Sequence, residues 1–338
     1  MKVDYYLPPT TLTTSVPDEA RRVAELGYDG LFTAETSHDP FIPLALAATA
    51  APGLTLGTAI AVAFPRSPMV TAQVAWDLAA MSEGRFILGL GTQVKPHIVR
   101  RFGMEWTTAT ARLRDYLDAL RAIWSSFQTG EGLRFDSDEY RFTLLTPFFN
   151  PGPIDHPEVP VAIAGVGPKL AELAGERCQG FHVHPFHTVR YLDDVIIPNI
   201  AAGAAAHGRT ASDVELISTV FVVTGRDEAE MAAASKAAKQ QMAFYASTPS
   251  YRGVLEAHGW DFGDELNRMS RRGEWDAMAD VIPDEVVATV GVVAEPDRVG
   301  QAIRDRYGDR IARIGYYTLD GAPALSDDEL AAMVASTR

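Results

Sequence analysis

Two short polar segments of the sequence carry side chains that could move a proton or bind a metal ion. Glu35 and His38 place a carboxylate and an imidazole three positions apart, and such groups often act as general acid and base. The alternative is that Glu35 hydrogen-bonds loop backbone and that His38 is exposed. His182 and His184 are two positions apart, so on a strand they point the same way and could bind a metal ion.

Two further segments have features that bind phosphate. Lys95, Arg100 and Arg101 are cations close together in the sequence, and such a cluster can pair with an anion. The segment 165–167 reads Gly-Val-Gly and precedes Pro168, a residue that suits the first position of a helix. The bare N–H groups at the start of a helix bind phosphate. Each feature also has a structural alternative, a solvated helix face for the cations and a tight turn for the glycines.

The composition restricts the classes of partner. The chain has 338 residues, and 44 Asp and Glu against 30 Lys and Arg give a net charge of -14. This charge disfavours nonspecific binding to nucleic acid or to an anionic membrane. Cys178 is the only cysteine, which excludes an internal disulfide and a zinc site built from cysteines. The sequence has no signal-peptide pattern and no apolar run near the ~20 residues of a membrane helix, so we expect a cytoplasmic protein with a small-molecule substrate.

Short apolar runs alternate with segments of helical period along the chain, which is typical of parallel βα units. For example, Val70, Val74, Leu78 and Met81 form one apolar stripe and predict a helix over 70–81. Strands are expected at 3–7, 31–34, 54–62, 86–90, 159–164, 180–184, 216–223 and 311–318. This pattern predicts an α/β fold, a closed (β/α)8 barrel of the TIM type. The alternative is an open doubly wound sheet.

Two segments depart from the alternation and are expected to be insertions in a single barrel domain that spans 1–338. Between about 127 and 158, polar and apolar residues alternate and prolines follow, which indicates a hairpin and a loop. Between 246 and 284, helical pieces without a strand pattern indicate a helical insertion.

The active site of such a barrel is built from loops at the carboxyl ends of the strands, where the polar segments described above fall. The segment 57–68 is unusually apolar for a loop, which suggests a wall that faces a planar ligand. His182 and His184 lie on the sixth predicted strand, whereas metal-dependent barrel hydrolases carry a similar pair on their first strand. We therefore expect these imidazoles to hydrogen-bond or stack, and a metal-dependent hydrolase is the weaker hypothesis.

Four segments taken together resemble the luciferase-like monooxygenase superfamily, in its coenzyme F-420-dependent branch. They are Glu35–His38, Leu56–Ile60, the run GRFILGLGT at Gly84–Thr92, and Val161–Gly167. The most specific feature is the succession of an LGT strand, a helix and GRFILGLGT in the order and spacing of the family. The resemblance covers nearly the whole chain and implies a barrel of the bacterial luciferase-like type.

By this resemblance, a flavin or deazaflavin lies at the barrel mouth with its ring against the third and fourth strands. The bond between Ala59 and Ile60, or its neighbour, is then a non-prolyl cis bond behind the ring. Thr92 and the segment 165–167 would hold ribityl and phosphate oxygens. The expected cofactor contacts are Ala59, Ile60, Ala61, Thr92, His97, Gly165, Val166, Gly167 and His184. The resemblance also implies a homo-oligomer, a dimer in this family.

The sequence departs from the sugar-phosphate dehydrogenases of this branch at two positions. Those enzymes place a histidine directly after the acid that ends the second strand, where this chain has Thr36, and a glutamate shortly after the fourth strand, where it has Val94. That particular activity is therefore not expected. We expect His38 to replace the missing imidazole as the catalytic group, with Glu35 holding its ring or contacting the cofactor.

These observations predict an oxidoreductase that transfers hydride between coenzyme F-420 and a small organic substrate. The cofactor carries such a reaction, so the protein needs to supply orientation, an apolar ring pocket and one proton donor or acceptor. The polyanionic tail of coenzyme F-420 fits the cations at 95–101 better than a single phosphate does. The alternatives are a luciferase-like monooxygenase that uses reduced FMN and a barrel that binds a flavin but has lost catalysis.

Overall fold

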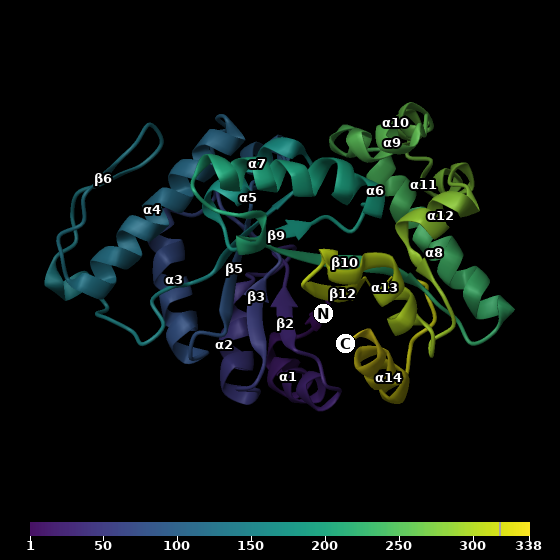
Figure 1. Cartoon of the computed structure of the whole chain (residues 1–338), viewed down its shortest axis with the longest axis horizontal. Coiled ribbons are helices and arrows are strands. Elements are labelled where there is room, and N and C mark those ends of the chain that lie inside the picture. The colour runs from purple at the N-terminus through teal and green to yellow at the C-terminus, as the bar shows by residue number, and fades with distance from the viewer. Residues whose placement is uncertain (318) are drawn as a thin grey trace.

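Eight parallel strands close into a barrel in the computed structural model, which describes residues 1–317 and 319–338. The pairings of β9 with β10 and of β12 with β1 complete the ring, which lies at the centre of the molecule (Figure 1). The strands of the ring are β1 (Lys2–Tyr6), β2 (Gly30–Thr33), β3 (Thr55–Thr58), β5 (Phe86–Gly91), β8 (Val161–Gly165), β9 (Gly180–Val183), β10 (Glu215–Val223) and β12 (Arg313–Tyr317).

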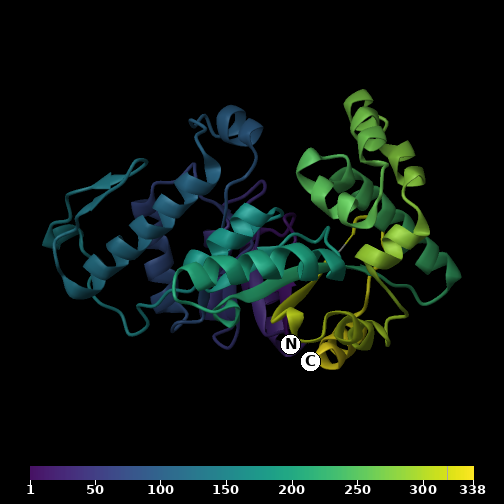
Figure 2. The same ribbon diagram turned by 45° about the horizontal axis from the view of Figure 1, so that its top comes forward.

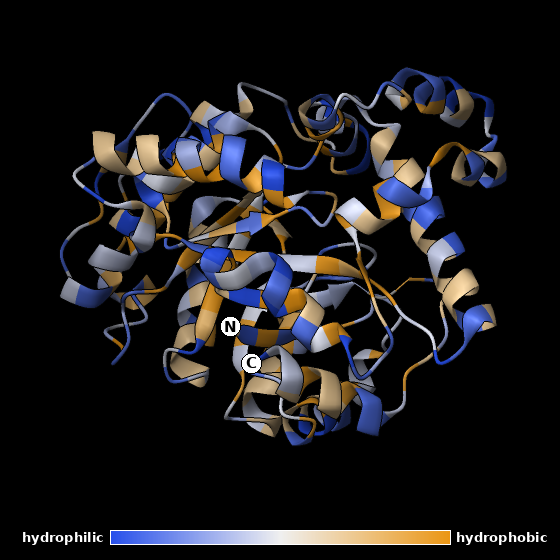
Figure 3. Cartoon of the chain, turned by 45° about the vertical axis from the view of Figure 1, so that its right-hand side comes forward, coloured by the Kyte–Doolittle hydropathy of each residue, from blue (hydrophilic) through white to orange (hydrophobic). Residues whose placement is uncertain are grey.

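The predicted (β/α)8 barrel is confirmed, and the alternative of an open doubly wound sheet is wrong because the ring closes. All eight predicted runs overlap these strands, since strands covered by helices are apolar on both faces and stand out in the sequence. Figure 3 shows this as hydrophobic colour along the central strands. The last residue of the predicted run 311–318, Thr318, lies outside the described residues.

The third predicted strand, 54–62, is broken in the structure. Its second part is β4 (Ala61–Val62), which pairs with β5, and the peptide bond between Ala59 and Ile60 is cis, as predicted. At the break the Thr58 hydroxyl donates to the Gly89 carbonyl (2.7 Å) and accepts from the Gly89 N–H (2.9 Å). The side chain thus replaces the backbone hydrogen bonds that the break removes.

Helices form the outer layer (Figure 2), and none of those in the described part of the chain has both the length and the apolar character needed to cross a membrane. The helices around the barrel are α1 (Val16–Glu25), α2 (Phe41–Ala50), α3 (Pro68–Met81), α4 (Ala109–Thr129), α5 (Pro168–Arg177), α6 (Val189–Tyr191), α7 (Ile197–Ala206), α8 (Glu228–Ala246), α13 (Val299–Tyr307) and α14 (Asp327–Thr337).

The two predicted insertions carry their own elements, at opposite ends of the molecule in Figure 2. The segment 127–158 holds an antiparallel hairpin of β6 (Phe135–Asp136) and β7 (Arg141–Phe142). The segment 246–284 holds the helices α9 (Arg252–His258), α10 (Gly263–Arg272) and α11 (Trp275–Met278). Helix α12 (Asp284–Val290) begins at its end, and β11 (Val292–Val293), which pairs with β10, comes next.

Helix α3 forms where it was predicted, but its buried face is shifted from the predicted stripe, in which Leu78 is buried and Val74 is half-buried. Val70 and Met81, two residues of the expected apolar stripe, are 53% and 44% exposed. The face that packs inward carries Ala72, Ala75 and Trp76 instead. Small alanines allow the helix to approach its neighbours closely, so they define the buried face although each is only weakly apolar.

A buried ion pair joins the first and last strands of the ring. The Arg313 guanidinium on β12 donates to both carboxylate oxygens of Asp4 on β1, at 2.8 and 2.5 Å. Both side chains are almost fully buried. Burial raises the pKa of Asp4 to about 6 although Arg313 lowers it, so the carboxylate is ionised at pH 7. A Cβ at Gly30 would lie 2.6 Å from the Asp4 carboxylate, so the neighbouring strand must have glycine there.

We predict that Asp4→Asn lowers the free energy of unfolding by ~3 kcal/mol or more, because it leaves the Arg313 charge buried without a counter-charge. The double variant Asp4→Leu/Arg313→Met removes both charges and is expected to lose less than Asp4→Asn does. Urea unfolding followed by circular dichroism measures both. A loss below ~1 kcal/mol for Asp4→Asn would show that the seam does not depend on this pair.

Candidate active site

A pocket of about 440 Å³ opens at the carboxyl ends of β3, β5, β8, β9 and β10. A volume of this size is typical of a ligand site. Seven of the eleven residues predicted for the site line this pocket: Ala59, Ile60, Thr92, Gly165, Val166, Gly167 and His184. Four do not: Glu35, His38, Ala61 and His97. Ser218, Thr219 and Tyr251 also line the pocket and were not predicted.

One wall of the pocket is the broken strand that contains the cis bond. Ile60 covers the pocket end of β5, where a Cβ at Gly91 would lie 2.6 Å from the Ile60 Cδ1 atom. Ala61 is fully buried within β4, so it supports this wall from behind rather than lining the pocket. The expected contact of Ala61 with a cofactor is therefore not supported by its position.

Glu35 holds this wall in place. Its Oε2 atom accepts from the Val62 N–H (2.7 Å) and from Arg66 (2.6 Å), and its own N–H donates to the Ile60 carbonyl (3.1 Å). The carboxylate is 6% exposed. Arg66 also pairs with Asp39 (3.0 Å) at the end of the same loop. Glu35 therefore fixes the backbone directly after the cis bond, which matches the interpretation of this residue as one that hydrogen-bonds backbone.

His38 is exposed on the loop between Glu35 and Asp39. The structure shows no hydrogen bond between Glu35 and the His38 ring, and the Oε2 atom of the carboxylate is bonded to Val62 and Arg66 instead. The signal for the Arg66 pairing could not be read from the sequence, since the two residues are 31 positions apart.

The turn after β8 leaves room for an anion. Gly167 is the N-cap of α5, and a Cβ at this position would meet no atom within 4 Å. The N-cap has no side chain to accept from the first N–H groups of the helix, which are therefore available to a phosphate. Gly165 has a different reason to be glycine, since a Cβ there would lie 2.6 Å from the Leu170 Cβ atom.

The opposite wall carries a hydrogen-bonded pair, His184 and Tyr251. The His184 Nδ1 atom accepts from the Phe186 N–H (3.1 Å), so its proton lies on Nε2, which is 3.0 Å from the Tyr251 hydroxyl. Burial lowers the pKa of His184 to about 3, so the ring is neutral at pH 7. Burial also raises the pKa of Tyr251 to about 12. Tyr251 therefore accepts from His184 and keeps its own proton available for a bound molecule.

Tyr251 could not be found from the sequence. It lies in the helical insertion, about 67 positions from His184, and follows no strand. Only the folded chain brings this segment over the barrel mouth.

His182 lies deeper in the same pocket. Its ring packs edge-on against Phe32, and its Nε2 atom is buried with no hydrogen-bond partner among the described residues. Burial, reinforced by Arg313, lowers the pKa of His182 to about 4. Both nitrogens of His184 are engaged, and within the described residues no group of three or more His, Cys, Asp or Glu could hold a metal ion. The pair thus lacks the arrangement that the metal hypothesis needs.

The basic segment after β5 divides into two parts. Arg101 donates to the Thr36 carbonyl and packs on Phe102, which joins this loop to the loop that carries His38. Lys95 and Arg100 are exposed and form no ion pair with the described residues. His97 is exposed in the same segment, outside the pocket, which does not support the expected cofactor contact.

Comparisons with known proteins agree with this architecture. A family model described as luciferase-like monooxygenase matches residues 8–313. An uncharacterized protein of Mycobacterium tuberculosis is 46% identical over 311 residues, which cover 90% of this chain and 92% of that protein. The F-420-dependent glucose-6-phosphate dehydrogenase of Intrasporangium calvum is 28% identical, with 85% and 83% covered. The solved structure of the coenzyme F-420-dependent tetrahydromethanopterin reductase of Methanopyrus kandleri has a TM-score of 0.78 at 19% identity, with 99% and 97% covered.

We predict that Gly167→Asp abolishes binding of a phosphate-bearing cofactor such as FMN and leaves the midpoint of thermal unfolding unchanged or higher. Aspartate is a more favourable N-cap than glycine by roughly a few tenths of a kcal/mol, but its charge repels a phosphate. Gly167→Ala is the matched control without charge and should still bind. Calorimetric titration and thermal unfolding of both variants make the test, and normal binding by Gly167→Asp would show that the turn is only structural.

Proposed function

Because the chain belongs to the luciferase-like monooxygenase family, we propose that it is an oxidoreductase that uses coenzyme F-420 and transfers hydride to or from a small organic substrate. The observation that carries this proposal is the mouth pocket, which combines an apolar wall, an open helix N-terminus and a neutral proton donor. When bound, the deazaflavin ring of this coenzyme supplies hydride transfer.

The residues of the pocket fit such a group. Ile60 and Val166 offer an apolar surface to a planar ring, and the space beside Gly167 admits a phosphate. These residues would bind and orient the coenzyme and exclude water from one face of its ring.

The choice of coenzyme F-420 over FMN rests on Lys95 and Arg100. Both are exposed in the segment that follows the pocket-lining residues Gln93 and Val94, in a chain of net charge -14, and neither has a carboxylate partner within the described residues. A polyanionic tail could pair with both cations, whereas the single phosphate of FMN is satisfied by the turn at Gly167. An FMN-dependent monooxygenase is the second candidate, and the same apolar wall supports it.

Tyr251 is the group of this chain that would give a proton to the substrate or take one back. His184 donates to its oxygen, which fixes the direction in which the hydroxyl proton points. His38 remains the alternative donor. It would have to turn inward from its exposed loop, which the contact between Arg101 and Thr36 holds beside the basic segment.

A homodimer also belongs to the proposal. Helices α2 and α3 lie side by side and expose the large apolar side chains Ile42, Val70 and Met81. Exposed apolar patches of this kind mark interaction surfaces in soluble proteins. Light scattering after size-exclusion chromatography measures the mass directly.

We predict that the protein binds coenzyme F-420 more tightly than FMN. The double variant Lys95→Glu/Arg100→Glu should weaken coenzyme F-420 by about tenfold and FMN much less, because it reverses two exposed charges that only the longer tail can reach. Calorimetric titration at low and high salt measures both effects. Tighter binding of FMN by the wild type would remove coenzyme F-420 from the proposal and leave the FMN alternative.

We predict that Tyr251→Phe lowers the rate of single-turnover hydride transfer by about a hundredfold and changes coenzyme affinity little. The variant keeps the aromatic ring and loses the hydroxyl, and general acid–base help is worth ~10²–10⁴ in rate. His38→Ala is the matched comparison and should be nearly silent. The reverse pattern, a slow His38→Ala and a normal Tyr251→Phe, would give the proton transfer to His38.

A further inference from the structure

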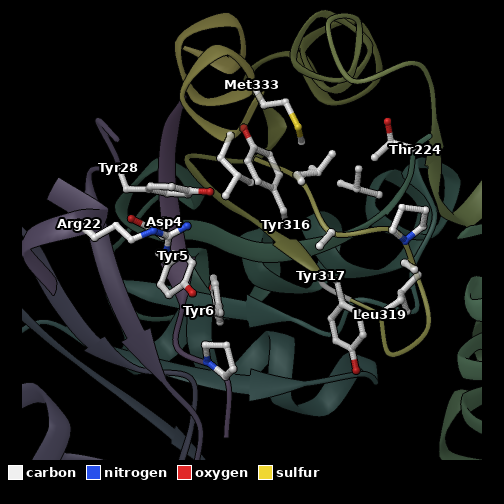
Figure 4. Close-up of a pocket in the computed structure, with 17 residues that line it drawn as sticks. Asp4, Tyr5, Tyr6, Arg22, Tyr28, Thr224, Tyr316, Tyr317, Leu319 and Met333 are labelled. Atoms are coloured by element: carbon white, nitrogen blue, oxygen red, sulfur yellow. The ribbon is translucent and has the colours of Figure 1, made fainter. Parts of the chain in front are cut away.

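A second pocket, of about 250 Å³, lies between strands β1 and β12 and the helices α1 and α14 that cover them (Figure 4). The segment 319–325, which leads into α14, forms another of its walls. Among the residues that line the two pockets, only Tyr6 contributes to both. The second pocket is therefore a site of its own and has no part in the function proposed above.

Aromatic rings form much of the wall. Tyr28 makes edge contacts with Tyr5 and with Tyr316, at centroid distances of 5.5 and 6.3 Å. The Tyr5 hydroxyl donates to Glu19 (2.6 Å), and the Tyr316 hydroxyl bonds Thr337 (2.8 Å). These two tyrosines are thus satisfied by the helices, and their rings are left to contact a ligand.

The hydroxyl of Tyr28 is different. It points into the cavity (Figure 4) and has no hydrogen-bond partner among the described residues, although the side chain is only 5% exposed. A hydroxyl that opens into an apolar cavity and has no partner within the described residues can donate to a bound molecule.

The charges around the pocket limit the ligand to a neutral molecule. Asp4 is paired with Arg313, and Arg22 is bonded to both Glu19 and Asp327. No lining charge is left to neutralise an ion, and three carboxylates nearby would repel an anion. The size limits it too, because an apolar cavity of ~150 Å³ already binds benzene, so this one admits a substituted single ring.

We propose that this pocket binds a small neutral aromatic compound with one acceptor atom, which accepts a hydrogen bond from the Tyr28 hydroxyl. The rings of Tyr5, Tyr28 and Tyr316 contact the ring of the ligand, and its acceptor faces the Tyr28 hydroxyl. The segment 319–325, which lines the cavity between β12 and α14, covers the ligand from outside.

Acetophenone is the probe, because it has one ring and one carbonyl acceptor. We expect saturable binding with one molecule per chain in ligand-observed NMR and calorimetry of the full-length protein. Ethylbenzene, which has the same shape without the acceptor, should bind about tenfold more weakly, and Tyr28→Phe should reduce acetophenone to the same level. Benzoate, the anionic analogue, should not bind.

Two filling variants identify which pocket the probe occupies. Ala322→Trp, in the 319–325 wall, should abolish acetophenone binding, whereas Thr92→Trp, in the mouth pocket, should leave it unchanged. Ala335→Trp on the exposed side of α14 is the control for the added tryptophan. Thermal unfolding checks that each variant is folded. Absence of saturable binding, equal affinity for ethylbenzene, or loss in Thr92→Trp instead of Ala322→Trp would overturn the proposal.

Discussion

The ion pair between Asp4 and Arg313 closes the ring of strands, and much of the interior is arranged around it. Arg313 lies over the Phe32 ring at 5.6 Å, Phe32 packs against His182, and Tyr6 stacks on Phe32. These contacts fill the barrel below the mouth, so the pocket has a solid floor. A ring without a free edge also leaves the backbone polar groups of the strands paired, and irregular chain can face a ligand only at the strand ends.

The mouth is built from departures from regular structure, each held by a side chain from elsewhere in the chain. Thr58 takes over the backbone hydrogen bonds of Gly89 where the third strand breaks. On the other side of the break, the Glu35 carboxylate accepts from the Val62 N–H, with Arg66 as its counter-charge. The close approach leaves no room for a side chain at Gly89, whose Cβ would lie 1.8 Å from the Thr58 carbonyl. Glu35, Thr58 and Gly89 belong to three separate sequence motifs, and together they hold the backbone at the break of the third strand.

The fold could be predicted because its signals are local. Strands apolar on both faces, glycine turns and the motifs that carry the family resemblance each occupy a few consecutive residues. Helix α2 gave no such signal, since its sequence FIPLALAATA is apolar throughout and has no helical period. The site was predictable in part for the same reason. Gly165 to Gly167 lie in one turn, whereas the partners of Glu35 and His184 lie dozens of residues away, and spacing along the chain does not report such contacts.

The origin of Tyr251 outside the barrel proper has a consequence for how such proteins diverge. The groups that fit a cofactor come from strands and their turns, which the core holds rigidly. The hydroxyl beside them comes from the helical segment 246–284, which lies over the mouth and contributes to no strand of the ring. Natural selection can therefore exchange that segment, and with it the side chains that face the mouth pocket, while the strands of the barrel are inherited unchanged.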